Sequence, residues 1–320
     1  MELGLFWLLA ERPLEPAALG QALGIPGNRC LRWLTLLEHV GLVEQTPTGY
    51  RPSPTAQAAI LDAYSQETWA FLAGEARARF PAVRNLAAHL RSPESVWALQ
   101  GLTPPDYFQA LQEDPEEARR FTRMLYEIHL PLADEIAAAL DLAGVERLLD
   151  LGGGSGVVSF ALLRRQPALH AVVVDIPNVC QAGREIAREN GLEERIRYHE
   201  ADFVQDALPG GFDLVLSCDA GVYRDEMFHK IAGALNAGGR LVIVDSFAPA
   251  PGVAPPSHRY WAFVSAMENP AAARPTVAEL QSRLAQACFE VLSTRALPPG
   301  EMRRWSSDWT MLEAKRRGSE

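Results

Sequence analysis

The spacing of apolar residues along the chain changes near residues 141–147. Before this segment, apolar side chains recur at helical spacing between Pro and Gly residues, which predicts helices. After it, short β-rich runs appear at 147–151, 170–176, 195–201, 212–218, 240–246, 289–297 and 308–316. Helical stretches separate the first five runs, so we expect a mostly parallel sheet with helices on both faces. The last two runs are close together and predict an antiparallel hairpin at one edge of the sheet.

The first hundred residues predict a small unit of their own. Helices are expected over 2–11, 16–23 and 29–40, followed by two short strands around the turn at 47–49. This order is typical of a winged helix, a fold that often binds DNA. Residues 1–100 contain eight Arg, no Lys and nine Asp or Glu, whereas a DNA-binding face is usually basic. The pattern therefore favours a packing or dimerisation module over a DNA reader.

The segment 115–140 predicts one long helix, which Pro131 should kink or break. Aromatic and Met residues are frequent in this part of the chain. At helical spacing such side chains belong more often to a core than to a ligand site. We place the boundary between a helical part and a sheet domain at residues 140 and 141.

Composition narrows the function classes. The chain has 320 residues, which suggests about two domains, and its formal net charge of −10 disfavours nucleic-acid binding. No uncharged apolar run reaches the ~18 residues of a membrane-spanning helix, and the apolar N-terminus lacks the basic leader of a secretory signal. The cysteines are far apart and predict neither a metal site nor disulfides, which suits a cytoplasmic protein: Cys30, Cys180, Cys218 and Cys288.

A glycine-rich loop follows the first strand of the predicted sheet and opens a helix. It reads Asp-x-Gly-x-Gly-x-Gly from Asp150 to Gly156, and Val157 stands where dinucleotide-binding loops have their last glycine. A carboxylate two residues before the first glycine suits a positively charged ligand better than a pyrophosphate. S-adenosylmethionine, with its sulfonium and ammonium groups, is such a ligand.

Two further acids follow the next strands. Asp175 ends the second strand, where an acid can bind both ribose hydroxyls, although a plain strand-end cap is the alternative. Asp202 and Phe203 follow the third strand and could bind the amino group and the ring of adenine. Because the carboxyl ends of parallel strands share one edge of the sheet, these acids are expected to lie close together.

Several longer segments resemble the S-adenosylmethionine-dependent O-methyltransferases of the plant caffeate and bacterial polyketide type. They are ELGLF, LLDLGGGSG, VVVDIPNV, HEADF, LPGGFDLVLS and ALNAGGRLVIVDSF, and together they span almost the whole chain. The resemblance implies a class I methyltransferase domain, with a Rossmann-like seven-stranded α/β sheet, at 141–320. It also implies a helical winged-helix domain at 1–140 that forms a homodimer and covers the substrate.

The same resemblance assigns the cofactor site, with S-adenosylhomocysteine as the product. The glycines of the loop, the ribose acid with its neighbour and the adenine pair carry over at Gly152, Gly154, Gly156, Asp175, Ile176, Asp202 and Phe203. The family often has Lys or Arg just after the fourth strand. This chain has Ser217 and Cys218 there, and we expect these two residues beside the cofactor together with Asp150.

The catalytic segment departs from the family. Gly221 stands at the position of the family's general base, a His, and Tyr223 at the position of a Trp, whereas Asp245 keeps the acid after the fifth strand. Tyr223 and His258 are the candidate replacements, since both resemble residues of the methyltransferases that act on bacteriochlorophyll-type tetrapyrroles. The alternatives are that Tyr223 is a core aromatic and that His258 lies in a surface loop.

The sequence therefore predicts a methyltransferase of secondary metabolism that acts on a bulky aromatic, tetrapyrrole or polyketide molecule, at a hydroxyl oxygen or an activated ring carbon. Candidate substrate contacts are Met124, Tyr126, His129, Trp261 and Met267. Because the usual His is missing, a relic that binds the cofactor without transferring a methyl group is the second hypothesis. A winged-helix regulator that binds DNA is the third, and we expect no metal in the site.

Overall fold

The computed structural model describes residues 1–78, 80, 84–103, 106–249, 263–270, 274–297 and 309–318. The chain divides into two compact units, Met1–Phe80 and Pro81–Glu320. The helices between residues 81 and 140 thus share a unit with the sheet, and the predicted boundary at residue 140 marks the start of the sheet instead. The reason is packing: Leu132 and Ile136, near the end of the last of these helices, are buried in a core of the sheet.

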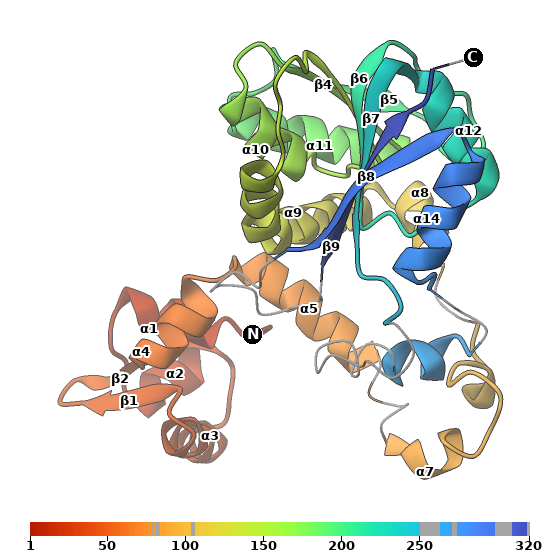
Figure 1. The fold of residues 1–320 in the computed structure, drawn as a ribbon. Coiled ribbons are helices and arrows are strands. Elements are labelled where there is room, and N and C mark those ends of the chain that lie inside the picture. The colour runs from red at the N-terminus through yellow and green to blue at the C-terminus, as the bar shows by residue number, and fades with distance from the viewer. Residues whose placement is uncertain are drawn as a thin grey trace. The chain divides into compact units, whose positions relative to one another are not determined.

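The N-terminal unit contains three helices, a two-stranded antiparallel hairpin and further helical segments (Figure 1). Its elements are α1 (Leu5–Glu11), α2 (Pro16–Ala22), α3 (Gly27–His39), β1 (Val43–Thr46), β2 (Gly49–Pro52), α4 (Pro54–Ala56), the π-helical turn η1 (Gln57–Leu61) and α5 (Gln66–Ala78). The apolar positions of α1 and α3, such as Leu5, Leu9 and Leu34, are buried in one core. The predicted order of helices and strands is present.

The second unit holds a seven-stranded sheet in the order β5-β4-β3-β6-β7-β9-β8. Its strands are β3 (Arg147–Leu151), β4 (His170–Asp175), β5 (Ile196–Glu200), β6 (Phe212–Cys218), β7 (Leu235–Asp245), β8 (Phe289–Ala296) and β9 (Thr310–Arg316). The first five strands pair in parallel, and β9 is antiparallel to both β7 and β8. The structure confirms the predicted α/β sheet and its C-terminal antiparallel hairpin.

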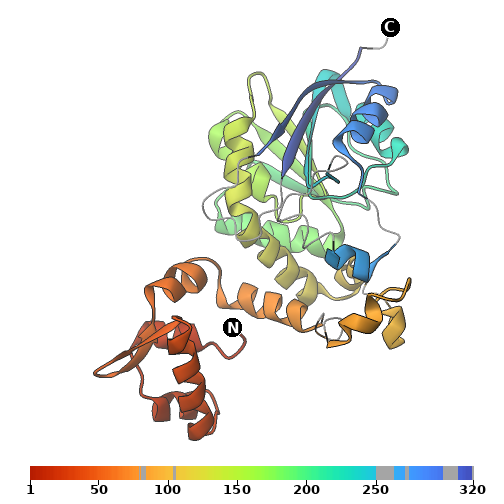
Figure 2. The ribbon, with the colours of Figure 1, turned by 60° about the horizontal axis from the view of Figure 1, so that its bottom comes forward.

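Helices cover both faces of this sheet (Figures 1 and 2). They are α9 (Pro115–Ala139), α10 (Val157–Arg165) and α11 (Pro177–Glu189) on one face, and α12 (Asp225–Ala234) and α14 (Val277–Gln286) on the other. The same unit also contains α7 (Leu86–His89), the 3-10 turn η2 (Ala98–Gln100) and α8 (Tyr107–Glu113). Side chains alternate along a strand, so Leu148 is buried with α9, α10 and α11, and its neighbour Leu149 with α12 and α14. Within the described residues, no helix is both long and apolar enough to cross a membrane.

Helix α9 is continuous through Pro131, so of the two expected effects, a kink or a break, the break does not occur. Its first turn is capped by Asp114, whose Oδ1 accepts the backbone N–H groups of Glu116 and Glu117 at 2.9 and 3.1 Å. Proline removes one helical hydrogen bond, but the helix buries apolar residues on both sides of it, such as Met124 and Leu132. Packing therefore holds the helix together where the local sequence would interrupt it.

Candidate cofactor and acceptor site

The glycine loop leaves β3 and turns directly into α10. Gly152, Gly154 and Gly156 have φ angles of 63°, 57° and 80°, a region that favours glycine. The N–H of Gly152 donates to the carbonyl of Val174 in β4 at 2.9 Å, and the N–H of Gly156 donates to Gly153 at 2.7 Å. No atom lies within 4 Å of the place where a Cβ at Gly154 would stand. The loop is thus tightly folded and leaves open space at Gly154.

Asp150 lies beneath this loop. Its side chain is 2% exposed and accepts a hydrogen bond from the Ser159 hydroxyl at 2.6 Å. A Cβ at Gly153 would stand 2.5 Å from the carboxyl carbon of Asp150, so this position has no room for a side chain. Burial raises the pKa of Asp150 to about 7, and the hydrogen bond from Ser159 lowers it only in part.

Asp175 closes the other side of the loop. Its two carboxylate oxygens accept the N–H groups of Gly154 at 3.0 Å and of Ile176 at 2.8 Å. Burial raises its pKa to about 6. Ile176 itself is buried in a cluster with Leu111 and other residues of α8, α9 and α11, so it holds Asp175 through its backbone. The buried carboxyl group of Asp150 and the half-buried one of Asp175 therefore flank the glycines.

The segment after β5 brings Phe203 to the loop. The nearest atom of its ring is 3.1 Å from the place of a Cβ at Gly152. Asp202 accepts the N–H of Val204 at 2.9 Å, which forms a tight turn. The ammonium group of Lys230 donates to the carbonyls of Phe203 and Val204 at 2.9 and 3.1 Å. Sequence reasoning missed Lys230, because it lies on α12 and no local motif connects it with this turn.

Ser217 and Cys218 end β6 beside the loop. Ser217 pairs with Leu151 in the parallel register of β6 and β3, which sets it next to the first glycine. Burial, followed by the charge of Asp219, raises the pKa of the Cys218 thiol well above its ordinary value. The thiol is therefore neutral.

Gly221 stands at the position that the resemblance gives to the family's His. Its φ of 65° lies in the left-handed region, and no described atom lies within 4 Å of the place where a Cβ would stand.

Tyr223 and Asp245, two of the three predicted catalytic residues, are in contact: the Tyr223 hydroxyl donates to Asp245. Asp245 is 3% exposed, and its other oxygen accepts the N–H of Ser246 at 2.6 Å and lies 3.5 Å from Arg274. Burial raises the pKa of both Tyr223 and Asp245. Tyr223 is consequently a neutral phenol that donates a hydrogen bond.

The third predicted catalytic residue, His258, and the predicted substrate contact Trp261 lie outside the described residues. Met124 is buried on α9. The carbonyl of Met267 accepts the N–H of Val96 at 2.9 Å, which connects two segments of the second unit.

Tyr126 and His129 lie one turn apart on α9 but have different partners. The Tyr126 hydroxyl donates to Asn190 at 3.1 Å, and its ring packs on Phe160 of α10. Nε2 of His129 lies 3.5 Å from a carboxylate oxygen of Asp219, directly after β6. The structure thus brings His129, and not Tyr126, to the carboxyl end of β6.

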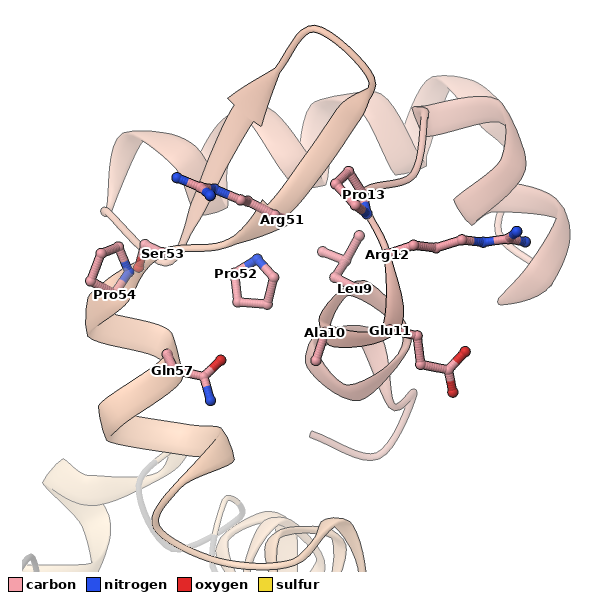
Figure 3. A pocket seen from close by; sticks show the side chains of 10 residues that line it. All are labelled: Leu9, Ala10, Glu11, Arg12, Pro13, Arg51, Pro52, Ser53, Pro54 and Gln57. Atoms are coloured by element: carbon pink, nitrogen blue, oxygen red, sulfur yellow. The ribbon is translucent and has the colours of Figure 1, made fainter.

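A separate open hollow lies in the N-terminal unit, between residues 9–13 and 51–57 (Figure 3). The charged ends of Glu11 and Arg12 point away from Pro52 in this view. Arg51 is exposed and pairs with Glu44 at 2.9 Å. The hollow has no buried ionisable group among its lining residues, and we assign it no chemistry.

The site at the sheet edge fits a ligand with a positive charge, two neighbouring hydroxyls and an adenine ring. Asp150 is buried and Asp175 half-buried, and a cation would lower the raised pKa values of both. Phe203 offers an aromatic face beside Gly152. Fold and site together define a class I methyltransferase. Residues 84–290 match the family described as O-methyltransferase domain, so the chain belongs to this family.

Individual relatives agree with this assignment. The N,N-dimethyltransferase OxyT of Streptomyces rimosus is 30% identical over 249 residues, which cover 77% of this chain and 72% of that protein. The mitomycin biosynthesis 6-O-methyltransferase of Streptomyces lavendulae is 28% identical over 264 residues, covering 77% of this chain and 72% of that protein. The crystal structure of human N-acetylserotonin methyltransferase in complex with S-adenosylmethionine matches with a TM-score of 0.78 at 20% identity, covering 99% of this chain and 92% of that chain. The latter likeness concerns the fold.

The predicted family, enzyme class and cofactor are thus confirmed: the protein is an S-adenosylmethionine-dependent methyltransferase with a small-molecule acceptor. These findings favour the methyltransferase over the two other hypotheses, the cofactor-binding relic and the DNA-binding regulator.

Proposed function

We propose that the protein methylates a hydroxyl group of a bulky aromatic molecule of the polyketide type, as an enzyme of cytoplasmic secondary metabolism. The observation that carries the proposal is the Tyr223–Asp245 pair at the same sheet edge as the glycine loop. The names of relatives support the acceptor class; one is the 3-hydroxy-5-methyl-1-naphthoate 3-O-methyltransferase of Streptomyces sahachiroi, 32% identical over 217 residues that cover 68% of this chain and 61% of that protein. A nitrogen acceptor is the second candidate, because OxyT is named as an N,N-dimethyltransferase.

The loop and the acids around it would bind the cofactor, which supplies a methyl group on a positively charged sulfur. Asp150 would stabilise the positive end of the ligand, Asp175 would accept the ribose hydroxyls, and Asp202 with Phe203 would hold the adenine. The remaining contacts come from Gly152, Gly154, Gly156, Ile176, Ser217 and Cys218.

The Tyr223–Asp245 pair would orient the acceptor. Because burial raises the pKa of Tyr223, its phenol donates a hydrogen bond and does not remove a proton. Asp245 holds this donor in place, and the backbone N–H of Ser246 fixes the carboxylate. His258 would act in proton transfer from the segment after β7. Met124, Tyr126, His129, Trp261 and Met267 would contact the acceptor.

The N-terminal unit would serve as a winged-helix dimerisation domain. Its α3 exposes the apolar residues Leu31 and Leu36, and Val40 directly after the helix is exposed as well; a second copy of the chain would cover all three. Light scattering on the purified full chain should give twice the monomer mass; the monomer mass would contradict the dimer.

The central experiment combines binding and turnover. Titration calorimetry with S-adenosylhomocysteine should show binding, and incubation with S-adenosylmethionine and hydroxynaphthoates should yield a methyl ether detected by mass spectrometry. Tyr223→Phe should lower turnover by tenfold or more, toward the smaller end of the effects of groups that assist proton transfer. Absence of binding would contradict the enzyme class. A product methylated on carbon or nitrogen would reject the hydroxyl acceptor.

A further inference from the structure

His129 has a fixed orientation on α9. Its Nδ1 lies 3.0 Å from the carbonyl oxygen of Leu125, one turn earlier in the helix. A carbonyl only accepts hydrogen bonds, so Nδ1 must carry the hydrogen. In the neutral ring the lone pair is then on Nε2, the atom that can take up a proton.

The imidazole ring is held at two further points. Its centroid lies 5.9 Å from that of the buried Trp309, with 71° between the planes, an edge-to-face contact. Nε2 lies 3.5 Å from Oδ2 of Asp219, and the side chain of His129 is 15% exposed. The proton-accepting atom of a nearly buried ring is thus turned toward a carboxylate.

Asp219 occupies the segment in which the family's base would stand. It follows the last residue of β6, and its backbone N–H donates to the carbonyl of Val244 in β7 at 2.9 Å. Its φ of 53° lies in a region that residues other than glycine rarely adopt. Its carboxylate is 41% exposed and so remains accessible beside Nε2. Asp219 therefore holds its unusual conformation at the sheet edge, two residues before Gly221.

The charge of Asp219 links this pair with the Tyr223–Asp245 pair. After burial, it is among the causes that raise the pKa values of Cys218, Tyr223 and Asp245. Asp219 therefore lies near the Cys218 thiol, the Tyr223 phenol and the Asp245 carboxyl group, and it also contacts His129. Tyr223 is bound to Asp245 through its hydrogen, which leaves Nε2 of His129 as the basic atom of this group.

We propose that His129 is the general base of the reaction, that Nε2 accepts the proton of the acceptor hydroxyl, and that Asp219 stabilises the resulting imidazolium. This inference rests on the proposed hydroxyl acceptor. It explains how the chain acts without a His at Gly221: the base is supplied by α9 instead of the segment after β6.

The proton transfer is balanced by the methyl transfer. The O–H bond of the acceptor breaks, an N–H bond forms at Nε2, and the electron pair of the O–H bond stays on oxygen. The oxygen forms its bond to the methyl carbon as the methyl–sulfur bond breaks and its electron pair remains on sulfur. The imidazolium then loses its proton to water when the product leaves.

The first test reads the hydrogen position and needs no turnover. The full chain, labelled with ¹⁵N in its histidines and saturated with S-adenosylhomocysteine, is studied by NMR, and His129 is assigned by the signal lost in His129→Asn. We expect the neutral ring to carry its hydrogen on Nδ1. A hydrogen on Nε2 in the neutral ring would overturn the proposal.

The second test compares two acceptors of different acidity, 2-naphthol and 1-nitro-2-naphthol. His129→Asn can keep a donor for the Leu125 carbonyl but removes Nε2, and Asp219→Asn removes the charge beside it. With 2-naphthol, His129→Asn should lower kcat about 100-fold or more. With the far more acidic nitronaphthol the loss should be less than about tenfold, because this acceptor ionises without a base.

His229 provides a matched control. Its Nδ1 contacts the carbonyl of Asp225 at 2.8 Å, also one turn earlier in a helix, but its side chain is exposed. His229→Asn should leave both rates unchanged, and all variants should bind S-adenosylhomocysteine like the parent chain. Equal losses of kcat with both naphthols would indicate a structural role of His129 and overturn the proposal. If His129→Asn does not fold, Asp219→Asn decides by the same comparison, the loss of kcat with 2-naphthol against the loss with 1-nitro-2-naphthol. If the parent chain methylates neither naphthol, the proposed acceptor class fails. The NMR measurement still tests Nε2 as the base, because a hydrogen on Nε2 in the neutral ring excludes it and a hydrogen on Nδ1 supports it.

Discussion

The affinity for S-adenosylmethionine should fall as the pH falls through the range set by Asp150 and Asp175. Burial raises the pKa of Asp150 to about 7 and that of Asp175 to about 6, from an ordinary value of 3.8. Below these values the two groups carry protons, and a positively charged ligand favours the ionised carboxylates. Protons must therefore leave when the cofactor binds, so binding is weaker at low pH.

The magnitude follows from linkage between protons and ligand. If both groups are fully ionised in the complex, the Kd is larger at about pH 5.5 than at pH 7 by a factor on the order of 60. At about pH 6.5, binding should release roughly one proton, most of it from Asp150. The ammonium group of the cofactor titrates above this range and does not obscure the effect.

Calorimetry in two buffers of equal pH and different ionisation enthalpy measures the number of protons released. Asp150→Asn should remove the larger part of the release. Ser159→Ala deletes the hydrogen bond that lowers the pKa of Asp150, so it should shift the affinity profile to higher pH. An affinity that is the same at both pH values, with no proton release, would refute the placement of these carboxylates against the cofactor.

Three further predictions concern the same site. Because the pKa of Asp150 is raised, the folded protein without cofactor binds more protons than the unfolded chain between about pH 4 and 7. The contribution of Asp150 to the free energy of unfolding therefore falls as the pH rises. In thermal melts, the stability gained by Asp150→Asn over the parent chain should grow over this range. Gly153→Ala places a Cβ 2.5 Å from the Asp150 carboxyl carbon and should abolish binding of S-adenosylhomocysteine. The control is Gly191→Ala, outside the loop, which meets no described atom within 4 Å, costs about 1–2 kcal/mol in the left-handed region and should retain binding; equal Kd values would contradict this difference. Tyr223→Phe should lower kcat without changing the Kd of S-adenosylhomocysteine, because its described hydrogen bond is to Asp245 and not to the loop; a matching loss of cofactor affinity would argue against a role on the acceptor side.

The sheet could be predicted from the sequence because helical stretches of the length that a parallel crossover needs follow most of the parallel β-rich runs. The helix expected between the runs 195–201 and 212–218 is absent, because residues 201–211 form turns that lead from β5 to β6 without a helix. The C-terminal hairpin was equally accessible, since the predicted runs 289–297 and 308–316 are separated by ten residues, fewer than a parallel crossover usually needs. The continuity of α9 was not accessible. A local rule about Pro131 competes there with burial of the helix against the sheet, and only the packed structure shows which of the two wins.

The cofactor half and the acceptor half of the site also differ in how far the sequence predicts them. The cofactor half depends on acids that end consecutive parallel strands, such as Asp150 and Asp175, and the sequence shows both the strands and the acids. The acceptor half depends on a contact between His129 on α9 and Asp219 after β6, two segments that no spacing rule connects. The conformation of Asp219, which aims its carboxylate at the ring, is likewise a property of the folded backbone.

Acids stand at or just after the carboxyl ends of five neighbouring parallel strands, β5, β4, β3, β6 and β7: Asp202, Asp175, Asp150, Asp219 and Asp245. The end of β6 carries the neutral Ser217 and Cys218. Such a row of negative groups favours positive charge at this edge. Before methyl transfer that charge is on the sulfonium; after transfer the sulfur is neutral, and the proposed proton on His129 carries one positive charge beside Asp219. The total charge at the edge is therefore the same before and after the reaction, and the carboxylates that attract the cofactor also stabilise the protonated base.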